Sequence, residues 1–235
     1  QPGQAPGLSE CLLAGLLCND SSLVRNEGRW EARGDPTEVA LIAAARKAGL
    51  QDDDVKSRLP RIDAIPFESQ HQFMATLHDN ASAGRKRIYL KGAVEVVIDR
   101  CSAAIDEHGQ PIPLDRQRVL GHVSRLAASG LRVLAFARAE AASATAHIRA
   151  SSLPSEFAFL GLQGMIDPPR PEAIEAVAAC HRAGIRVKMI TGDHTETAVS
   201  IGRQLGLMEK DPAPDRSSAL TGKDLAAISD EELID

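Results

Sequence analysis

Residues 167–171 (Asp-Pro-Pro-Arg-Pro) most constrain how this chain can fold, because three of the five are proline. Proline fixes one backbone dihedral and has no amide hydrogen, so neither a helix interior nor a central strand can run through this stretch. We therefore expect a stiff turn or hinge at 167–171. It divides the chain into two predicted domains, residues 1–166 and residues 167–235.

The part before the hinge has the pattern of an antiparallel sheet with helices. Three β-rich runs at 61–67, 72–78 and 85–91 follow one another, and residues 80–84 between the last two are typical of a hairpin. Further elements are expected as helices at 8–17, 36–47, 94–100 and about 119–130, and as strands at 131–137 and 157–166. This order indicates an α+β domain, an antiparallel sheet flanked by helices.

The part after the hinge resembles half of a parallel α/β sheet. A helical apolar face begins at Ile174, and residues 185–190 form an almost continuous apolar run typical of a buried strand. A helix is expected at 195–205, then a loop at 210–218, and Ser229 with Glu232 suggests a capping box for a last helix. We expect an incomplete α/β domain.

Residues 34–38 (Gly-Asp-Pro-Thr-Glu) mark the start of the helix at 36–47. Asp35 suits the N-cap, and Pro36 suits the first helical position. Glu38 follows the cap by three residues, which is the spacing of a capping box.

Composition excludes several classes of function. The formal charge is −5 and no basic cluster stands out, so we expect no nucleic-acid partner. The four cysteines lack paired metal-ligand spacing and are typical of reduced thiols in the cytosol. No apolar run approaches the roughly 18–20 residues of a membrane span. Because the chain starts without Met and stops soon after a predicted helix begins, we expect a cytosolic piece of a larger protein.

Residues 191–193 (Thr-Gly-Asp) follow the predicted strand and open the next helix. Ligands bind open α/β sheets at this edge, and the free amide groups of a helix N-terminus suit phosphate. The hydroxyl of Thr191 can donate to a phosphate oxygen, and Gly192 allows close backbone approach. The alternative is a plain strand–helix turn that Asp193 caps.

Lys91 and Gly92 close a predicted strand. Lys91 can project into a nucleotide cleft while Gly92 lets a base lie against the backbone. The alternative for Lys91 is an exposed lysine at a strand end. Arg132, near the start of another strand, carries a planar fork that suits phosphate, and an ordinary surface arginine is the alternative.

Phe67, Glu38 and Asp167 are further candidates. Aromatic residues make up only 3% of the chain, and the flat ring of Phe67 at a pocket wall can stack on adenine for about 1–3 kcal/mol. Its alternative is core packing. Glu38 can accept a hydrogen bond from the adenine amino group as well as cap its helix. Asp167 can orient a hinge arginine or approach phosphate-bound Mg²⁺, or it can simply cap a turn before proline.

Taken in order, six short motifs resemble the large cytosolic loop of P-type cation-transporting ATPases, type II in particular. They are GDPTE at 34–38, PFE at 66–68, KGA at 91–93, GLRVLA at 130–135, DPPR at 167–170 and TGD at 191–193. The similarity extends from Leu8 to the end of the chain. It implies a nucleotide-binding domain inserted into a haloacid-dehalogenase-like phosphorylation domain, with the hinge between them.

The resemblance also implies roles for individual residues in binding ATP with its Mg²⁺. The implied ATP-binding residues are Glu38, Phe67, Lys91, Gly92, Arg132, Thr191, Gly192 and Asp193. The first four would form the adenine pocket, Arg132 would reach the phosphates or brace the base, and the last three would meet the γ-phosphate after the domains close. Asp167 and Arg170 would belong to the hinge.

Several positions depart from the family pattern. Val94 stands where a proline is usual, and His194 stands where an asparagine is usual. The run after Phe67 carries the neutral Ser69 and Gln72 and lacks the lysine and arginine of many relatives, which weakens its attraction for phosphate.

The family's phosphorylated aspartate lies in Asp-Lys-Thr-Gly-Thr, and this sequence has no such motif. The Gly-Asp-Gly-x-Asn-Asp run and the lysine that hold phosphate and Mg²⁺ are missing too. Phosphoryl transfer needs metal, nucleophile and charge clamps together. We therefore expect no catalytic residue and no metal site here, and a fragment that binds ATP without hydrolysing it.

The implied intact protein is an ATP-driven cation pump of a bacterial plasma membrane that forms an aspartyl-phosphate intermediate. Its membrane and actuator domains would be the partners, and the transported cation, for which Ca²⁺ is favoured, would not bind this fragment. Two alternatives remain. One is a free-standing phosphatase of the haloacid-dehalogenase class, although residues 52–54 (Asp-Asp-Asp) follow a helix end instead of the required strand. The other is a non-catalytic nucleotide sensor.

Overall fold

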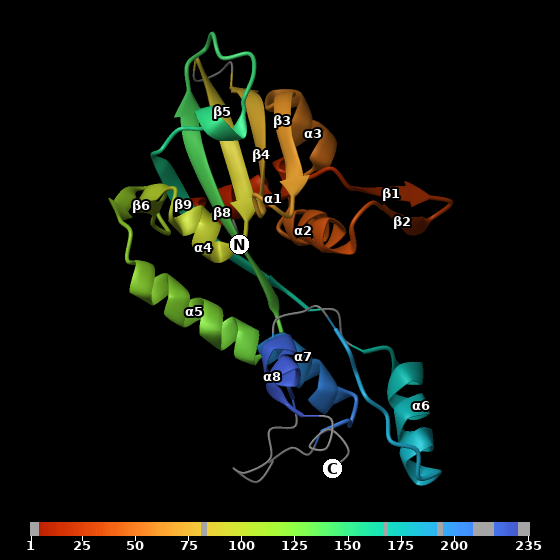
Figure 1. Ribbon diagram of the computed structural model, residues 1–235. Helices are drawn as coiled ribbons and strands as arrows, with labels where there is room; N and C mark the ends of the chain where they lie inside the picture. Colours follow the sequence, from red (N-terminus) through yellow and green to blue (C-terminus); the bar gives the residue numbers. More distant parts are fainter. Residues whose placement is uncertain (1–4, 81–83, 167–168, 192–194, 209–218, 230–235) are drawn as a thin grey trace. The chain divides into compact units, whose positions relative to one another are not determined.

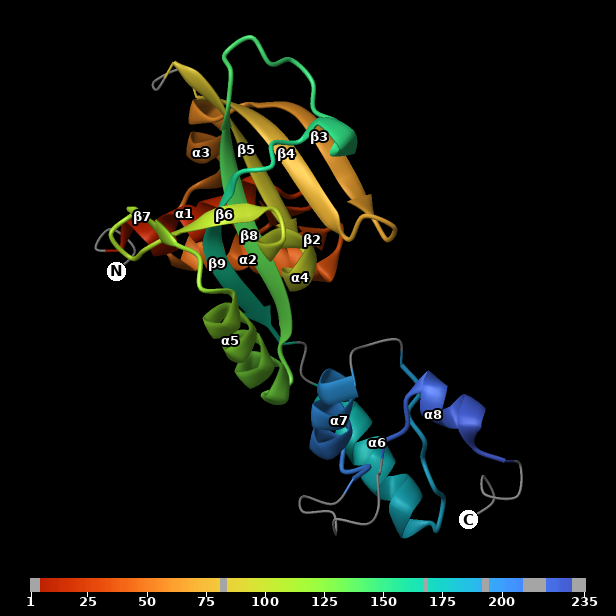
Figure 2. The same cartoon turned by 60° about the vertical axis from the view of Figure 1, so that its left-hand side comes forward.

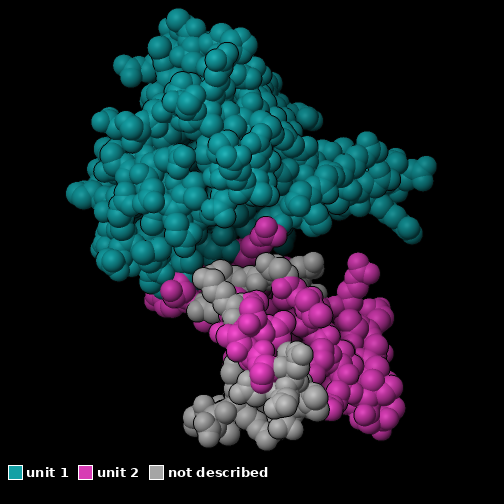
Figure 3. All heavy atoms as spheres, viewed as in Figure 1, with its two compact units in different colours: residues 1–123, 133–165 teal, residues 124–132, 166–235 magenta. Residues whose placement is uncertain are grey.

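A computed structural model describes residues 5–80, 84–166, 169–191, 195–208 and 219–229 (Figure 1). The chain divides into two compact units, coloured separately in Figure 3. One unit contains residues 1–123 and 133–165, and the other contains residues 124–132 and 166–235. In the described residues, no helix combines the length and the apolar character needed to cross a membrane.

The first unit is built on a seven-stranded, mostly antiparallel sheet of order β3-β4-β5-β8-β9-β6-β7 (Figures 1 and 2). One pair, β6 with β9, is parallel. The strands are β3 Arg61–Glu68, β4 Phe73–Asn80, β5 Arg85–Gly92, β6 Cys101–Ile105, β7 Pro111–Pro113, β8 Arg132–Ala141 and β9 Phe157–Met165. The mixed α/β architecture with a largely antiparallel sheet confirms the expectation for this part of the chain.

Helices and a small ribbon complete this part of the chain. The helices are α1 Pro6–Leu17, α2 Pro36–Lys47, α3 Asp52–Arg58, α4 Val94–Ile98, α5 Arg116–Ala128 and a short 3-10 turn at Ala150–Ser152. Two strands, β1 Ser22–Asn26 and β2 Arg29–Arg33, form a separate antiparallel ribbon that projects from the body of the unit (Figure 1). Every residue of β2 is exposed.

The central strands are buried on both faces, because successive side chains pack into two different cores. Phe73 and Leu77 of β4 join one core with α4 and Ile148. Met74 of β4 and Tyr89 of β5 join the other core with α1 and α2, which lie behind the sheet in Figure 2. Helix α2 therefore packs on the same face of the sheet as the side chains of Met74 and Tyr89.

The predicted N-cap residue of α2, Asp35, is confirmed. The Asp35 carboxylate accepts hydrogen bonds from the amides of Thr37 at 2.9 Å and Glu38 at 3.2 Å. The second half of the predicted capping box is wrong. The Asp35 amide donates instead to Ser21 Oγ at 2.9 Å, because the Glu38 side chain is engaged by residues outside its own helix.

The three predicted strands at 61–67, 72–78 and 85–91 and the hairpin between the last two are confirmed as β3, β4 and β5. The β1–β2 ribbon and α3 were not predicted. Asp52 begins α3, so the run at 52–54 lacks the preceding strand that a phosphatase nucleophile motif needs.

The second unit contains α6 Pro171–Arg182, α7 Thr195–Gln204 and α8 Gly222–Ala227. The first two were predicted, whereas α8, which has a capping box of Thr221 and Asp224, was not. The predicted buried strand at 185–190 is wrong, since these residues form no strand and Ile190 is 97% exposed. A parallel strand depends on hydrogen bonds from neighbouring strands, and no described residue of this unit supplies one. The predicted loop at 210–218 and the helix after Ser229 lie outside the described residues.

Candidate functional site

Three predicted site residues lie at the same end of the sheet. The strand register pairs Phe73 of β4 with Glu68 of β3 on one side and with Gly92 of β5 on the other. Phe67 therefore lies near the end of β3, at the same end of the sheet as Lys91 and Gly92. Residues well separated in the sequence are brought together by antiparallel pairing.

The Lys91 side chain is buried and forms an ion pair with Glu38. Lys91 is only 4% exposed, and its ammonium donates to Glu38 Oε1. The alternative of an exposed lysine at the strand end is therefore wrong. Burying two charges carries a large desolvation penalty, which pairing and further hydrogen bonds must offset. Helix α2 supplies Glu38 from its first turn, so the helix start and the strand end form one site.

Three residues that the sequence analysis missed hold Glu38 from the other side. Its Oε2 accepts hydrogen bonds from the Asp20 amide at 3.0 Å and from Ser21 Oγ at 2.8 Å. Its backbone oxygen accepts from Asn19 Nδ2 at 2.8 Å. The run at 19–21 (Asn-Asp-Ser) is typical of an ordinary turn after a helix, so the sequence alone gives no signal for this role.

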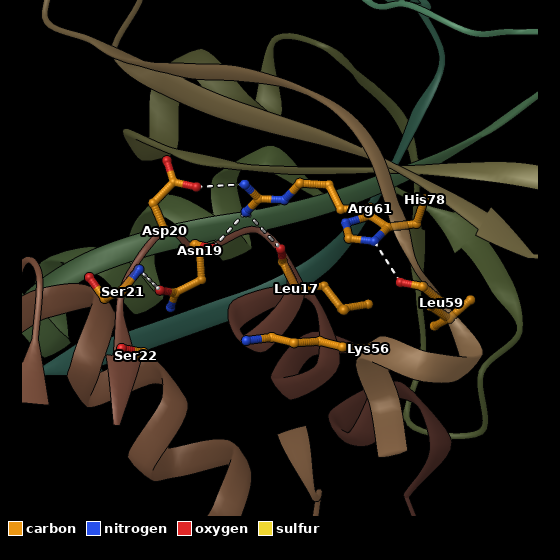
Figure 4. A pocket seen from close by; sticks show the side chains of 9 residues that line it. All are labelled: Leu17, Asn19, Asp20, Ser21, Ser22, Lys56, Leu59, Arg61 and His78. Atoms are coloured by element: carbon orange, nitrogen blue, oxygen red, sulfur yellow. Dashed lines mark hydrogen bonds and ion pairs between the residues drawn. The ribbon is translucent and has the colours of Figure 1, made fainter. Parts of the chain in front are cut away.

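Arg61 at the start of β3 fixes this turn. Its guanidinium donates to the Asp20 carboxylate and to the Asn19 backbone oxygen, each at 2.6 Å. Figure 4 shows the turn and Arg61 around a hollow of about 400 Å³, which His78 also lines. None of the predicted ATP-binding residues lines this hollow. The turn at 19–21 thus lines the hollow on one side and contacts Glu38 on the other.

His78 is buried beside this hollow, and its environment favours the neutral imidazole. The pKa of His78 is lowered from 6.5 to about 4. Burial is the main cause, the hydrogen bond to Leu59 opposes it, and the nearby charge of Arg61 adds to the lowering. The ring Nδ1 contacts the Leu59 backbone oxygen at 2.9 Å, so this nitrogen carries the hydrogen (Figure 4). His78 therefore lines the hollow without adding charge to it near neutral pH.

Close packing of the strands leaves no room for a side chain at Gly92. A Cβ there would lie 2.4 Å from the Gln72 backbone oxygen and 2.8 Å from Phe73 Cα, so β4 approaches β5 more closely than a side chain allows.

Phe67 does not pack into either core. It is 57% exposed, so core packing is the wrong interpretation of this aromatic residue. An exposed ring at a strand end is available for stacking on a flat ligand.

The remaining predicted residues belong to the second unit or lie outside the described residues. Arg132 is exposed at the start of β8, Thr191 is exposed, and Arg170 is the N-cap residue of α6. Gly192, Asp193 and Asp167 lie outside the described residues. In the described ranges, histidine, cysteine, aspartate and glutamate form no group of three that could hold a metal ion.

Comparison with known proteins identifies similar chains. The sequence profile of the family described as "P-type ATPase, cytoplasmic domain N" matches residues 7–172. A cation-transporting ATPase of Synechocystis sp. is 47% identical over 98% of this chain and 25% of its own length. A probable cation-transporting ATPase F of Mycobacterium tuberculosis is 46% identical over 93% of this chain and 24% of its own length. A calcium-transporting ATPase of Bacillus subtilis is 38% identical over 96% of this chain and 25% of its own length. The chain thus spans about a quarter of the length of these relatives.

Proposed function

This chain belongs to the P-type cation-transporting ATPases, and we propose that it is the part that binds ATP in an ATP-driven cation pump. The observation that carries the proposal is the ion pair between Lys91 and Glu38 at the end of β5. Phe67 is exposed at the same end of the sheet. A fixed carboxylate, a buried cation and an exposed ring are complementary to an adenine base. The site needs no rearrangement of the sheet to present them.

Each group has a proposed part in recognising the base. The ring of Phe67 stacks on adenine, Glu38 accepts a hydrogen bond from the adenine amino group, and Lys91 holds Glu38 and closes the floor of the pocket beside Gly92. Guanine has a carbonyl oxygen where adenine has its amino group. A carboxylate at that position therefore repels guanine, which makes the proposed pocket selective for ATP over GTP.

The phosphates are proposed to meet Arg132 and residues of the second part of the chain. Arg132 reaches the phosphates or braces the base, and Thr191, Gly192 and Asp193 meet the γ-phosphate. The proposed division is a nucleotide-binding domain at 1–166 and part of a haloacid-dehalogenase-like domain at 167–235, with Asp167 and Arg170 in the hinge at 167–171. Mg²⁺ arrives with the nucleotide phosphates.

The fragment is proposed to bind ATP without completing phosphoryl transfer. The sequence contains neither the aspartate of Asp-Lys-Thr-Gly-Thr nor the run that holds Mg²⁺ and phosphate. Incubation with radiolabelled ATP and Mg²⁺ is therefore expected to leave no acid-stable phosphate on the chain. A Mg²⁺-dependent, hydroxylamine-sensitive label would contradict this, because it would require an acyl-phosphate nucleophile within these residues.

The intact pump is proposed to lie in a bacterial plasma membrane. It is also proposed to move Ca²⁺, the ion in the name of the Bacillus subtilis calcium-transporting ATPase. The membrane and actuator domains would be its partners, and the cation would bind outside this fragment. Uptake of radioactive Ca²⁺ by inverted vesicles containing the intact protein, compared with Na⁺ and Mn²⁺, tests the ion. ATP-dependent uptake of another cation alone would replace Ca²⁺.

The adenine site is tested by calorimetric titration of the chain with ATP, AMP and GTP. We expect saturable binding of ATP and AMP with a Kd on the order of 0.1–1 mM, since one stacked base and a few hydrogen bonds must offset the entropy of association. GTP should bind more weakly. Phe67→Ala and Lys91→Glu should each weaken ATP binding, whereas Ile112→Ala, which removes an exposed apolar side chain from β7, should not. No ATP binding at several millimolar would refute the proposed function.

A further inference from the structure

We propose that Ser21 is a positioning residue for nucleotide specificity, because it fixes which oxygen of Glu38 is open to the base. The inference rests on the proposed adenine site and adds a residue outside it. Ser21 lies in the turn between α1 and β1 and does not belong to the helix or strand that carries the predicted pocket.

The hydrogen bonds of Glu38 leave a single oxygen available. Oε2 accepts from the Asp20 amide at 3.0 Å and from Ser21 Oγ at 2.8 Å, which uses both lone pairs of that oxygen. Oε1 accepts from the Lys91 ammonium and keeps one lone pair. A ligand amino group can therefore be accepted at Oε1 and at no other atom of this carboxylate.

The proton of the Ser21 hydroxyl has a defined direction. Ser21 Oγ accepts the Asp35 amide at 2.9 Å, so its lone pair is occupied on that side. The two acceptors within reach are Glu38 Oε2 at 2.8 Å and the Asp35 backbone oxygen at 3.5 Å, and the closer, charged oxygen takes the proton. Ser21 is only 6% exposed, so bulk water has little access to this donor.

The backbone around Ser21 prevents the hydroxyl from turning away. Its amide donates to Asn19 Oδ1 at 2.9 Å. A Cβ on Gly34 would lie 2.2 Å from Ser21 Oγ, and Gly34 has a φ of +108°, so only glycine leaves this space to the hydroxyl. Ser21 is thus locked by groups on both sides of it.

This arrangement has a consequence for base selection. With Oε2 held by Ser21 and the Asp20 amide, the carboxylate cannot rotate to give both oxygens to Lys91, and Oε1 stays directed towards the base as an acceptor. An alanine at position 21 removes one of the two donors to Oε2, so that the Asp20 amide alone opposes the pull of the Lys91 ammonium on both oxygens. The acceptor that favours the adenine amino group and repels the guanine carbonyl is then weakened, while the stacking contact of Phe67 is unchanged.

The test is a calorimetric titration of four chains with ATP and with GTP: the unaltered chain, Ser21→Ala, Glu38→Ala and the double variant. Because the Asp20 amide still binds Oε2, the loss of the Ser21 hydrogen bond acts on the base only indirectly. It predicts a Kd for ATP raised about 3–10-fold in Ser21→Ala, with the Kd for GTP within about twofold. In the Glu38→Ala background, Ser21→Ala should have no further effect on ATP, since the two residues act through one carboxylate. Ser22→Ala is the matched control, because the Ser22 hydroxyl has no hydrogen-bond partner in the described part of the chain.

The outcomes separate this inference from the proposed function. If the unaltered chain binds ATP better than GTP and Ser21→Ala keeps that ratio, the role of Ser21 is refuted and the adenine site stands. An equal loss of ATP and GTP affinity with a lowered unfolding temperature would make Ser21 a purely structural residue and would also refute the role. If the unaltered chain does not bind ATP, the proposed function fails, and this inference fails with it.

Discussion

Lys91 is a charged residue between apolar neighbours on the central strands of the sheet, and Glu38 is its partner. Lys91 has Met74 and Phe136 as its direct neighbours on the adjacent strands, and all three are buried. An unpaired ammonium in such a place would be strongly destabilising, so each charge depends on the other. The turn at 19–21 adds two donors to the Glu38 carboxylate, which together with Lys91 hold it at a fixed orientation.

Substitution of Gly92 tests how closely the strands pack beside Lys91 and Glu38. A methyl group there would meet the Gln72 backbone oxygen at 2.4 Å, and backbone cannot move as a flexible side chain can. Gly92→Ala should therefore lower the free energy of unfolding by about 1–3 kcal/mol in urea denaturation. Gly121→Ala in α5 is the control, since its Cβ would meet nothing within 4 Å, and it should be neutral or stabilising. Equal effects of the two substitutions would contradict this packing.

His78 predicts a pH dependence of stability. Its pKa is 6.5 when the group is unperturbed and about 4 in the fold, so the unfolded chain binds more protons between these values. Stability is then complete above pH 6.5 and is lost as pH falls towards 4, by about 2 kcal/mol between pH 7 and pH 5. Urea denaturation across this range should show a shallower slope for His78→Gln. His108→Gln, at an exposed histidine, should keep the slope of the unaltered chain, and no difference between the two variants would refute the assignment.

At the scale of elements, α2 is the part that the site depends on most. Its apolar side chains Leu41, Ile42 and Ala45 are buried in the core that it shares with α1. Its first turn carries Glu38, and its last turn carries Arg46. Any rotation of the helix would move Glu38 away from Lys91, so contacts at the far end of α2 also keep the site in register.

Arg46 is the strongest of these distant contacts. Its guanidinium binds the Asp52 carboxylate through two hydrogen bonds of 2.8 and 2.7 Å, and it also lies 4.9 Å from the centre of the Trp30 ring. Arg46→Gln should lower the free energy of unfolding by about 1–3 kcal/mol, because a partly buried bidentate pair and a stacking contact are lost together. Chemical denaturation measures the change.

Arg58 supplies the matched control for this pair. It forms an ion pair with Asp54 in the preceding turn of α3, but both side chains are more than 60% exposed. Exposed pairs of this kind contribute little, so Arg58→Gln should change the free energy of unfolding by less than about 0.5 kcal/mol. An effect as large as that of Arg46→Gln would mean that burial does not set the strength of these pairs.

At the scale of the whole molecule, the residues proposed for the base come from one unit. Glu38, Phe67, Lys91 and Gly92 all lie within residues 1–123 and 133–165, and both apolar cores are made from residues of that unit. The residues proposed for the phosphates belong to the rest of the chain. Truncation after residue 166 therefore separates the proposed base contacts from Thr191, Gly192 and Asp193, while Arg132 stays with the base contacts.

A chain of residues 1–166 tests this separation. We expect it to fold and to bind AMP with a Kd within about threefold of that of the 235-residue chain, since the base contacts are retained. Calorimetry with AMP, together with the amide dispersion of the truncated chain, measures both points. A folded 1–166 chain that no longer binds AMP would show that the second part contributes to the base site, against the proposed domain division.

Local sequence patterns predicted most elements of the first unit. The alternation and apolar content of β3, β4 and β5 and the Asp35 cap of α2 depend on hydrogen bonds and side-chain positions within a few residues. The β1–β2 ribbon was missed because its second strand is exposed throughout and carries no apolar alternation. The strand predicted at 185–190 failed for the opposite reason, since an apolar run forms a strand only where a neighbour pairs with it.

The sequence by itself determined the family, the helix that carries Glu38, and the strand end that carries Lys91 and Gly92, because these depend on motifs and periodicities that are local. Only the tertiary structure decided that Lys91 is buried, that Phe67 is exposed, and that Ser21 and the Asp20 amide hold Glu38. A turn 17 residues before Glu38 reaches it only after α1 and α2 have packed on the sheet. The orientation of a buried carboxylate depends on every donor that packing brings near it, and no local pattern records that set of neighbours.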